Sequence, residues 1–591
     1  MPRTTLALNS FVSGEFSAKL DGRQDFPKYN TSCKVLENFL VAPQGAAQRR
    51  VGTQFIDEVK DSSKKTRLIP FEFSTAQTYI LEFGDGYIRF FKDKGQIVTG
   101  SPSVAYEISS PYLEAELFDI KFAQSADVMY LCHPNHNVRK LSRTGHTSWT
   151  LTTVSFSGSP ATPIAGANNR PSCVSFFEQR LVFANSNNNP QTLWFSKSGD
   201  YENMSTGTNA DSAMIYTIAS NQVNAIRFIK TQRTLIIGTT GGEFTVSADG
   251  TDAAVTPTNI AIKRQSTFGS ANVDAQPAGN ATLFLQRARR KVRELSFNFD
   301  VDGYQASDLT ILNESVTQSG ITEMAYQQSP DSILWCVRED GVLAGLTYLR
   351  SEEVIAWHRH IFGGSFGNGN AQVESVASIS GEINEDELWV IVKRTVNGAT
   401  KRYVECFSNF DFDETDSNSF KFLDSHLSYS GSATTTLSGL AHLEGQTVSI
   451  LADGSAHPDK VVSGGAITLN RSVTKAVVGL KYNSVLQTMR IEGGAAEGTS
   501  QGKTKRISKV TLRLFETVGV KVGPSLDNLE AIPFRTTSSP LGQPVKTLIA
   551  GDKEIEFNDD FNSDGFITIQ QDQPLPCSIL AIYPTLVTSD G

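Results

Sequence analysis

The sequence has no excess of basic residues. Among its 591 residues are 53 lysines and arginines against 62 aspartates and glutamates, which gives a formal net charge of −9. Proteins that hold nucleic acid steadily neutralise its phosphates with many basic side chains. The charge balance therefore disfavours stable binding of DNA or RNA.

Sequence features of several other protein classes are also missing. No apolar run reaches the roughly 18 residues of a membrane span, and the N-terminus lacks the apolar stretch of a secretory signal. No phosphate-binding loop of the GxxxxGK[ST] or GxGxxG type opens a helix, so we expect no nucleotide and no other cofactor. The six cysteines lie tens of residues apart with no CxxC pair, which indicates free buried thiols in a soluble protein made in a reducing cytoplasm.

The residues that are abundant indicate strands. The chain has 46 Gly, 35 Phe and 15 Tyr but only 6 Met, with few long runs of strong helix formers. With 39% hydrophobic and 19% charged residues the composition is that of a globular protein. We therefore expect a mostly β fold.

A pair of short apolar runs recurs along the chain. The first runs start at residues 78, 128, 180, 234, 282, 333 and 388, so that their spacing stays between 48 and 55 residues. Each is followed, after a short turn, by a second run that starts at residue 87, 138, 192, 244, 292, 343 or 403. Glycine-bearing turns such as Gly84-Asp85-Gly86 and Asn397-Gly398 supply the backbone that tight hairpins need. The pattern predicts seven β-hairpins.

A hairpin with about 20 further residues per unit has the size of a four-stranded propeller blade. We therefore predict a β-propeller of six or seven blades over residues 65–410. A run of meanders in two β-sandwiches would use the same hairpins, but sandwiches have no reason to keep a nearly constant spacing.

The segments on either side of the repeats have a different character. Residues 1–64 do not repeat, and a rough 3.6-residue stripe predicts a helix from Pro27 to Leu40. The acidic stretch 411–419 is typical of a linker. Residues 411–591 behind it are strand-rich and predict one or two β-sandwich-like modules.

Candidate metal ligands and catalytic residues are weak. Asp560, Asn562 and Asp564 resemble the first half of a Ca²⁺ loop, but Gln571 stands where such a loop has its bidentate Glu, so a structural turn is favoured. Cys132-His133-x-x-His136 offers zinc ligands, but no second pair accompanies it, so a hairpin turn is favoured there too. Gly363-x-Ser365-x-Gly367 matches the nucleophile elbow of hydrolases without a helix pattern after it. We expect no enzyme and no catalytic residues.

Several stretches of residues 1–410 together match a known family. The N-terminal residues that carry the resemblance are Phe11, Gly14-Glu15, Gly22-Arg23, Asp25, Tyr29, Glu37-Asn38, Pro43-Gln44-Gly45, Arg49-Arg50 and Gly52-Thr53. Further matches cover residues 69–91, 170–204, 241–250, 256–273 and 290–310, whereas Ala46 and Val51 stand where the family has Gly and Pro. The sequence resembles the tail nozzle proteins of short-tailed bacteriophages (podoviruses), also called tail tubular protein B or tail stabilization proteins.

The resemblance implies a structural protein of the virion tail, made in the bacterial cytoplasm. It implies a ring, six-fold in the family, that docks to the adaptor and portal, lies near fibres or spikes, and provides or closes the channel for DNA ejection. DNA would pass through without being held, in keeping with the net charge.

On this basis we expect residues 1–64 and the C-terminal modules to form the platform that meets the adaptor. We expect four residues of the N-terminal segment, Arg49, Arg50, Arg23 and Tyr29, to dock to the adaptor or a neighbouring subunit. Charge reversal of Arg49 and Arg50 should then block assembly and leave folding intact. We also expect Arg289 and Arg290, in a basic hairpin turn, to touch DNA in the lumen. The alternative is a glycan-binding or glycan-cleaving propeller of the tail, which needs an aromatic pocket with paired carboxylates at one mouth.

Overall fold

The computed structural model describes residues 3–158, 164, 166, 168–219, 222–249, 253–381, 385–410, 412, 416, 419–493, 499–535 and 548–589. These residues form strands and short 3₁₀ helices, and none of them lies in an α-helix. The 3₁₀ helices are η1 (Ala18–Leu20), η2 (Pro27–Thr31), η3 (Glu114–Asp119), η4 (Phe299–Val301), η5 (Arg350–Glu352) and η6 (Ala441–Leu443). Across the described part of the chain, no helix has the length and apolar character needed to cross a membrane.

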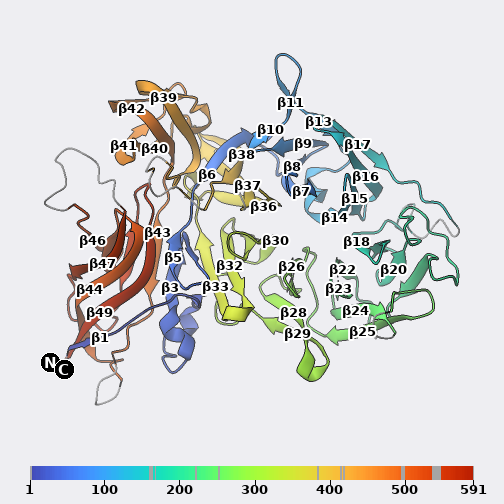
Figure 1. Cartoon of the computed structure of the whole chain (residues 1–591), viewed down its shortest axis with the longest axis horizontal. Helices are drawn as coiled ribbons and strands as arrows, with labels where there is room; N and C mark the ends of the chain where they lie inside the picture. Colours follow the sequence, from blue (N-terminus) through green and yellow to red (C-terminus); the bar gives the residue numbers. More distant parts are fainter. Residues whose placement is uncertain are drawn as a thin grey trace.

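Seven antiparallel sheets are arranged around a common centre as the blades of a β-propeller (Figure 1). Blade one contains β7 (Arg67–Ser74), β8 (Gln77–Gly84), β9 (Tyr87–Lys92), β10 (Gly95–Gln96) and β13 (Glu107–Ser109), and carries the small hairpin β11 (Val98–Thr99) and β12 (Val104–Ala105). Blade two contains β14 (Lys121–Ser125), β15 (Val128–His133), β16 (His136–Gly145) and β17 (Ser148–Thr153). Blade three contains β18 (Cys173–Phe177), β19 (Arg180–Ala184), β20 (Thr192–Phe195) and β21 (Met214–Thr217).

The remaining blades continue the same order around the ring. Blade four contains β22 (Ile226–Thr231), β23 (Leu235–Thr239), β24 (Gly242–Ala248) and β25 (Ile260–Ser266). Blade five contains β26 (Gln276–Ala278), β27 (Ala281–Leu285), β28 (Val292–Asn298) and β29 (Gly303–Asp308). Blade six contains β30 (Ile321–Gln327), β31 (Ile333–Arg338), β32 (Leu343–Leu349) and β33 (Val354–His360). Blade seven contains β36 (Gln372–Ser380), β37 (Asp386–Val396), β38 (Ala399–Phe407) and β6 (Thr53–Glu58), and the small hairpin β34 (Ser365–Phe366) and β35 (Gly369–Asn370) precedes it.

The predicted propeller is confirmed, and it has seven blades. Each of the seven hairpins predicted from the repeat is the second and third strand of one blade. The second strands are apolar along their length because both of their faces are packed; β19, β23 and β27, for example, are buried throughout. Turn residues have the expected positive φ, at +82° for Gly86 and +75° for Gly398.

The N-terminal segment closes the ring. Strand β6 pairs antiparallel with β38 and completes blade seven, so the last blade combines residues from both ends of the propeller segment. The expected boundary at residue 64 is therefore wrong for Thr53–Glu58, which belong to the propeller. Such closure ties the first and last parts of the repeat together.

The predicted helix from Pro27 to Leu40 is also wrong beyond its first turn. The 3₁₀ turn η2 ends at Thr31, and strand β3 (Ser32–Glu37) follows. A register shift between Cys33 and Val35, where β3 pairs with β43 (Ser484–Thr488), interrupts the alternation of sides. Cys33 and Leu36 are both fully buried, and a bulge of this kind imitates the three-residue spacing of a helix.

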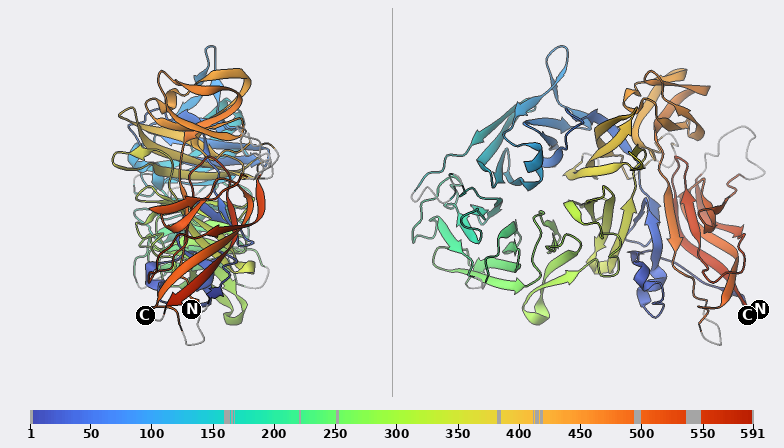
Figure 2. Two further views of the ribbon diagram at one scale, coloured as in Figure 1. Left: turned by 90° about the vertical axis from the view of Figure 1, so that its left-hand side faces the viewer. Right: turned by 180° about the vertical axis from the view of Figure 1, so that it is seen from behind.

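The C-terminal residues form two β-modules beside the propeller (Figures 1 and 2), as the sequence predicts. The first consists of β39 (Asp424–Ser438), β40 (Thr447–Ala452), β41 (Ser455–Val461) and β42 (Ala466–Leu480), and continues the sheet of blade seven. In the second, two sheets share one core; its C-terminal strands are β43, β44 (Thr504–Thr517), β45 (Lys521–Ser525), β46 (Asn528–Ala531), β47 (Ile549–Glu556), β48 (Thr568–Gln571) and β49 (Ser578–Ser589). The acidic stretch 411–419 lies largely outside the described residues.

The N-terminal segment joins these modules to the propeller. Strands β2 (Gly14–Glu15) and β3 lie between β33 of blade six and β43, which makes one continuous ten-stranded sheet. Strands β1 (Arg3–Thr5), β4 (Phe39–Val41) and β5 (Ala47–Arg49) add to the sheet of β49. The segment is thus part of the core rather than a separate docking platform.

We predict that Gly52→Ala destabilises this junction. A Cβ at Gly52 would lie 1.9 Å from the carbonyl oxygen of Leu423 and 2.5 Å from its amide nitrogen, and backbone atoms cannot rotate away. Overpacking of this kind should lower the free energy of unfolding by about 2–3 kcal/mol, measured by urea denaturation. Gly22→Ala is the control, because a Cβ there meets no atom within 4 Å; equal effects of the two substitutions would contradict the prediction.

Candidate functional sites

Arg50, an expected docking residue, lies at the centre of the junction between the propeller and the C-terminal modules. Its side chain is 0% exposed and forms two hydrogen bonds of 2.7 Å with the carboxylate of Asp424. Its Nε donates to Asn38 Oδ1 at 2.9 Å, and its guanidinium lies 3.7 Å from the ring centroid of Tyr482. All of these partners are also buried, so Arg50 is a structural residue.

The ion pair extends into a buried polar network. Thr53 Oγ1 donates to Glu405 Oε2 at 2.6 Å and lies 3.4 Å from Asp424 Oδ1. Arg394 pairs with Glu405 from the neighbouring strand of blade seven. Burial would raise the pKa of the Asp424 carboxyl, but the charge of Arg50 and its hydrogen bonds outweigh burial and lower it. The network therefore keeps Asp424 ionised where blade seven meets the first C-terminal module.

Arg49 is buried beside Arg50 and donates hydrogen bonds to the second C-terminal module. Its Nη1 donates to the carbonyl oxygen of Leu575 at 2.8 Å and to that of Gln573, and its Nη2 donates to the carbonyl oxygen of Tyr482 at 3.0 Å. The prediction that Arg49 and Arg50 dock to another protein is wrong, because neither guanidinium reaches the surface of the chain. Charge reversal there would disrupt folding rather than leave it intact.

The other two expected docking residues differ from each other. Tyr29 is buried, and its hydroxyl donates to the carbonyl oxygens of Asp21 at 3.1 Å and Arg490 at 3.3 Å, so its expected docking role is also wrong. Arg23 is exposed and pairs with Asp25 at 2.9 Å, Nε to Oδ1. Of the four, only Arg23 is placed where another protein can reach it.

Arg289 and Arg290 lie in the exposed turn between β27 and β28 of blade five. Arg289 has a left-handed backbone, with φ of +60°, and its Nη2 lies 3.5 Å from Glu339 Oε2 of blade six. Contact of these residues with DNA stays a prediction.

The loop with Asp560, Asn562 and Asp564 is a hydrogen-bonded turn. Asn562 Oδ1 accepts from the amides of Asp564 and Gly565 at 2.8 and 2.9 Å, and its Nδ2 donates to Asp559 Oδ1 at 2.9 Å. Asp564 forms an ion pair of 2.6 Å with Arg490. These contacts engage Asn562 Oδ1 and one carboxylate oxygen of Asp564, two of the three side chains that a Ca²⁺ ion would need, so the structural interpretation is favoured over a metal site.

Two cavities lie along the centre of the propeller. The larger, about 1160 Å³, opens at one mouth and combines the aromatic side chains of Phe297, Phe299, Tyr326 and Tyr348 with Glu72, Glu294, Arg350 and Asp386. The smaller, about 300 Å³, is lined by charged side chains of the inner strands. Two ion pairs lie there, Arg67–Glu323 at 2.9 Å and Lys121–Asp274 at 3.2 Å.

The chain's matches to catalytic patterns do not form a catalytic site. Ser365 starts the hairpin β34–β35, and strand β36 rather than a helix comes directly after that hairpin, so Ser365 is not in a nucleophile elbow. His358 and His360 are fully buried in blade six, and the Nδ1 of His358 lies 2.7 Å from the Nε2 of His360. Burial lowers the pKa of both rings, to about 3 for His358.

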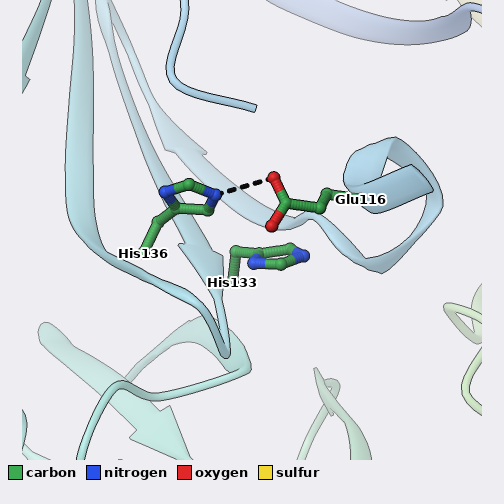
Figure 3. A group of neighbouring side chains, drawn as sticks. All are labelled: Glu116, His133 and His136. Carbon is green, nitrogen blue, oxygen red and sulfur yellow. Dashed lines mark hydrogen bonds and ion pairs between the residues drawn. The ribbon is translucent and has the colours of Figure 1, made fainter. Parts of the chain in front are cut away.

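Sequence reasoning missed one cluster of side chains. Cys132 and His133 end β15 and His136 begins β16, which confirms the expected hairpin. The structure adds Glu116 from η3, whose Oε2 lies 2.8 Å from His136 Nε2 (Figure 3). Among the described residues, this trio alone brings three His, Cys, Asp or Glu ligand atoms within 4.8 Å of one another. No fixed spacing links Glu116 to the histidines, so the sequence pattern alone could not show it.

Comparison with known proteins adds little beyond the fold class. No protein-family model matches the chain, and no curated protein does. Solved structures that are similar include the β-propeller domain of Cps50 (Swd1) from Myceliophteria thermophila, at 8% identity and a TM-score of 0.37 over 60% of this chain and all of that one. The WD40 domain of Neurospora crassa Pan2 matches at 10% and 0.35 over 62% of this chain and 96% of that one, and the RRP9 WD40 repeats at 7% and 0.39 over 61% and 100%.

Proposed function

We propose that the chain is a structural subunit of the ring that ends a short bacteriophage tail, docked to the adaptor and portal. The observation that carries the proposal is the rigid coupling of a seven-bladed propeller to two β-modules through continuous sheets and the buried Arg50–Asp424 pair. A ring subunit must hold several contact surfaces in fixed relative positions. The resemblance of residues 1–410 to tail nozzle proteins supports the same role.

The route for DNA in this proposal lies between subunits. The propeller's own centre is narrowed by the Arg67–Glu323 and Lys121–Asp274 pairs, which line a cavity of only about 300 Å³ there. A lumen formed by several copies would be mildly acidic overall, with exposed Arg289 and Arg290 as isolated basic contacts. Weak and scattered contacts allow DNA to pass without being held.

Exposed apolar side chains at one hairpin provide a surface for a neighbouring subunit. Around the tip between β28 and β29, Phe297 is 52%, Phe299 89% and Val301 58% exposed. Apolar groups clustered at an exposed tip are typical of surfaces that another protein covers. We assign this tip to the contact between copies in the ring.

The test is electron microscopy of virion tails and of the purified chain with its adaptor. We expect a six-fold ring. The double substitution Phe299→Ser, Val301→Ser should weaken its assembly by about 10- to 100-fold, because it removes the free energy that is gained when one or two such apolar side chains are buried. Leu526→Ser is the control, since this side chain is exposed on the second C-terminal module. Tails without this chain in a terminal ring would refute the proposal.

One observation favours a second candidate function, binding or cleavage of a glycan. The cavity of about 1160 Å³ at the propeller mouth combines aromatic faces with Glu72 and Asp386. Burial raises the pKa of Glu72, and the nearby Asp386 charge adds to this, as an acid in a glycosidase site requires. Saccharide binding on a glycan array that is lost in Tyr326→Ala, or sugar release by the purified chain, would favour this candidate over the ring.

A further inference from the structure

The cluster of Glu116, His133 and His136 lies where the connection between blades one and two meets blade two. Glu116 belongs to η3, which leads from blade one into β14, and the two histidines flank the tip of the β15–β16 hairpin (Figure 3). Cys132 is not part of the cluster, because neighbouring residues of a strand point to opposite sides and its thiol is buried in a hydrophobic core.

The three side chains are close to the geometry of a metal site. Their ligand atoms lie within 4.8 Å of one another, and the closest pair, His136 Nε2 and Glu116 Oε2, is 2.8 Å apart. Four ligands at bond lengths of about 2.0–2.2 Å around a tetrahedral Zn²⁺ lie about 3.4 Å from each other. Small rotations of the side chains therefore suffice to enclose an ion.

The surroundings hold polar groups without partners. His133 is 1% exposed; its Nδ1 accepts from the backbone N–H of Asn135 at 3.1 Å, whereas its Nε2 has no partner. The ring of Tyr112 packs edge-on at 5.0 Å from His136 and 6.0 Å from His133, and its buried hydroxyl also lacks a partner. Unsatisfied buried groups cost about 1–3 kcal/mol each, and a bound water molecule can supply their missing partner.

We propose that Glu116, His133 and His136 bind one Zn²⁺ ion, with water in the fourth position, and that the ion fastens the connection between blades one and two to the β15–β16 hairpin. Two imidazoles and one carboxylate form a nitrogen and oxygen ligand set that suits Zn²⁺. At His133 the bond to the ion takes the place of the contact with the Asn135 amide. This site is independent of the proposed role in the tail.

The test uses the full chain after treatment with a chelator. Titration with Zn²⁺ should show one site per chain, and bound Co²⁺ should give the visible absorption of a tetrahedral complex. Glu116→Gln and His136→Gln should each weaken Zn²⁺ binding at least 10-fold and remove the Co²⁺ spectrum. Zn²⁺ should also raise the thermal unfolding midpoint of the wild type and not that of the variants.

His146→Gln is the matched control, since His146 is an exposed histidine of the same blade. It should keep the affinity and the spectrum of the wild type. Both test variants should unfold at the midpoint of the metal-free wild type, which separates a lost ligand from a lost fold. Absence of saturable binding, or equal binding by His136→Gln and the wild type, would overturn the proposal.

Discussion

Replacing Arg50 with methionine should lower the free energy of unfolding by about 3–5 kcal/mol. The substitution leaves the carboxylate of Asp424 buried with only the amide of Gly363 at 2.8 Å and the more distant Thr53 hydroxyl as donors. A buried charge without its partner is far more costly than the intact pair is stabilising. Asp424→Asn should have an effect of similar size, because it leaves the Arg50 guanidinium unpaired. Urea denaturation followed by tryptophan fluorescence measures both.

The double substitution Arg50→Met, Asp424→Leu tests the cause. Because it removes both charges from the same buried site, it should restore most of the lost stability. Arg23→Met is the surface control, because Arg23 is exposed and pairs with Asp25. It should leave the unfolding transition in urea unchanged. If the double variant were as unstable as the sum of the single ones, lost packing rather than an unpaired charge would be the reason.

The parts of the fold that depend on local sequence could be predicted. The seven hairpins follow from apolar runs and turn glycines that lie within about 25 residues of one another, and from the spacing of 48 to 55 residues at which the hairpin recurs. The propeller and its blade order follow from repeating that unit. Strand β3 could not be predicted in this way, because apart from the two-residue strand β2 its partners are β33 and β43, more than 300 residues away in the chain, and its register shift imitates a helix.

The role of a charged residue likewise depends on distant partners. The sequence suggests that Arg49 and Arg50 are a basic pair on the surface. Asp424, which follows Arg50 by 374 residues, instead makes Arg50 part of the core. Glu116 joins the two histidines only because η3 folds back over the β15–β16 hairpin. A sequence pattern can identify interacting residues only when a fixed number of residues separates them. No such fixed separation links Arg50 to Asp424, or Glu116 to the two histidines.

A second large effect is expected in acid. His358, His360 and His426 are fully buried. Burial lowers their pKa values, to about 3 for His358 and about 4 for His426, and for His360 the neighbouring His358 adds to the effect. In the unfolded chain each ring has its ordinary pKa of about 6.5. Unfolding between pH 6.5 and 4 therefore takes up protons that the folded chain does not bind.

The direction of the pH dependence follows from this difference. Stability that depends on a lowered histidine pKa is complete above pH 6.5 and decreases as the pH falls, by about 1.4 kcal/mol per pH unit for each ring. Glu82 acts in the opposite direction, since burial raises its folded pKa to about 7 and it holds a proton that the unfolded chain has released. Near pH 5 these three rings and Glu82 together contribute a slope on the order of 3 kcal/mol per pH unit; the lowered pKa of His442 adds to it, whereas the raised pKa values of buried acids such as Glu15 and Glu243 oppose it.

Substituting the histidines should reduce that slope, whatever it does to the stability at neutral pH. His358→Gln with His360→Gln keeps hydrogen-bonding side chains next to each other and removes two of the three titrating rings. The free energy of unfolding, measured in urea at pH values from 4.5 to 7.5, should then vary with pH by about 3 kcal/mol per unit less near pH 5 than in the wild type. Equal slopes for the wild type and the double variant would show that the two rings already bind protons in the folded chain, and that burial does not keep them neutral.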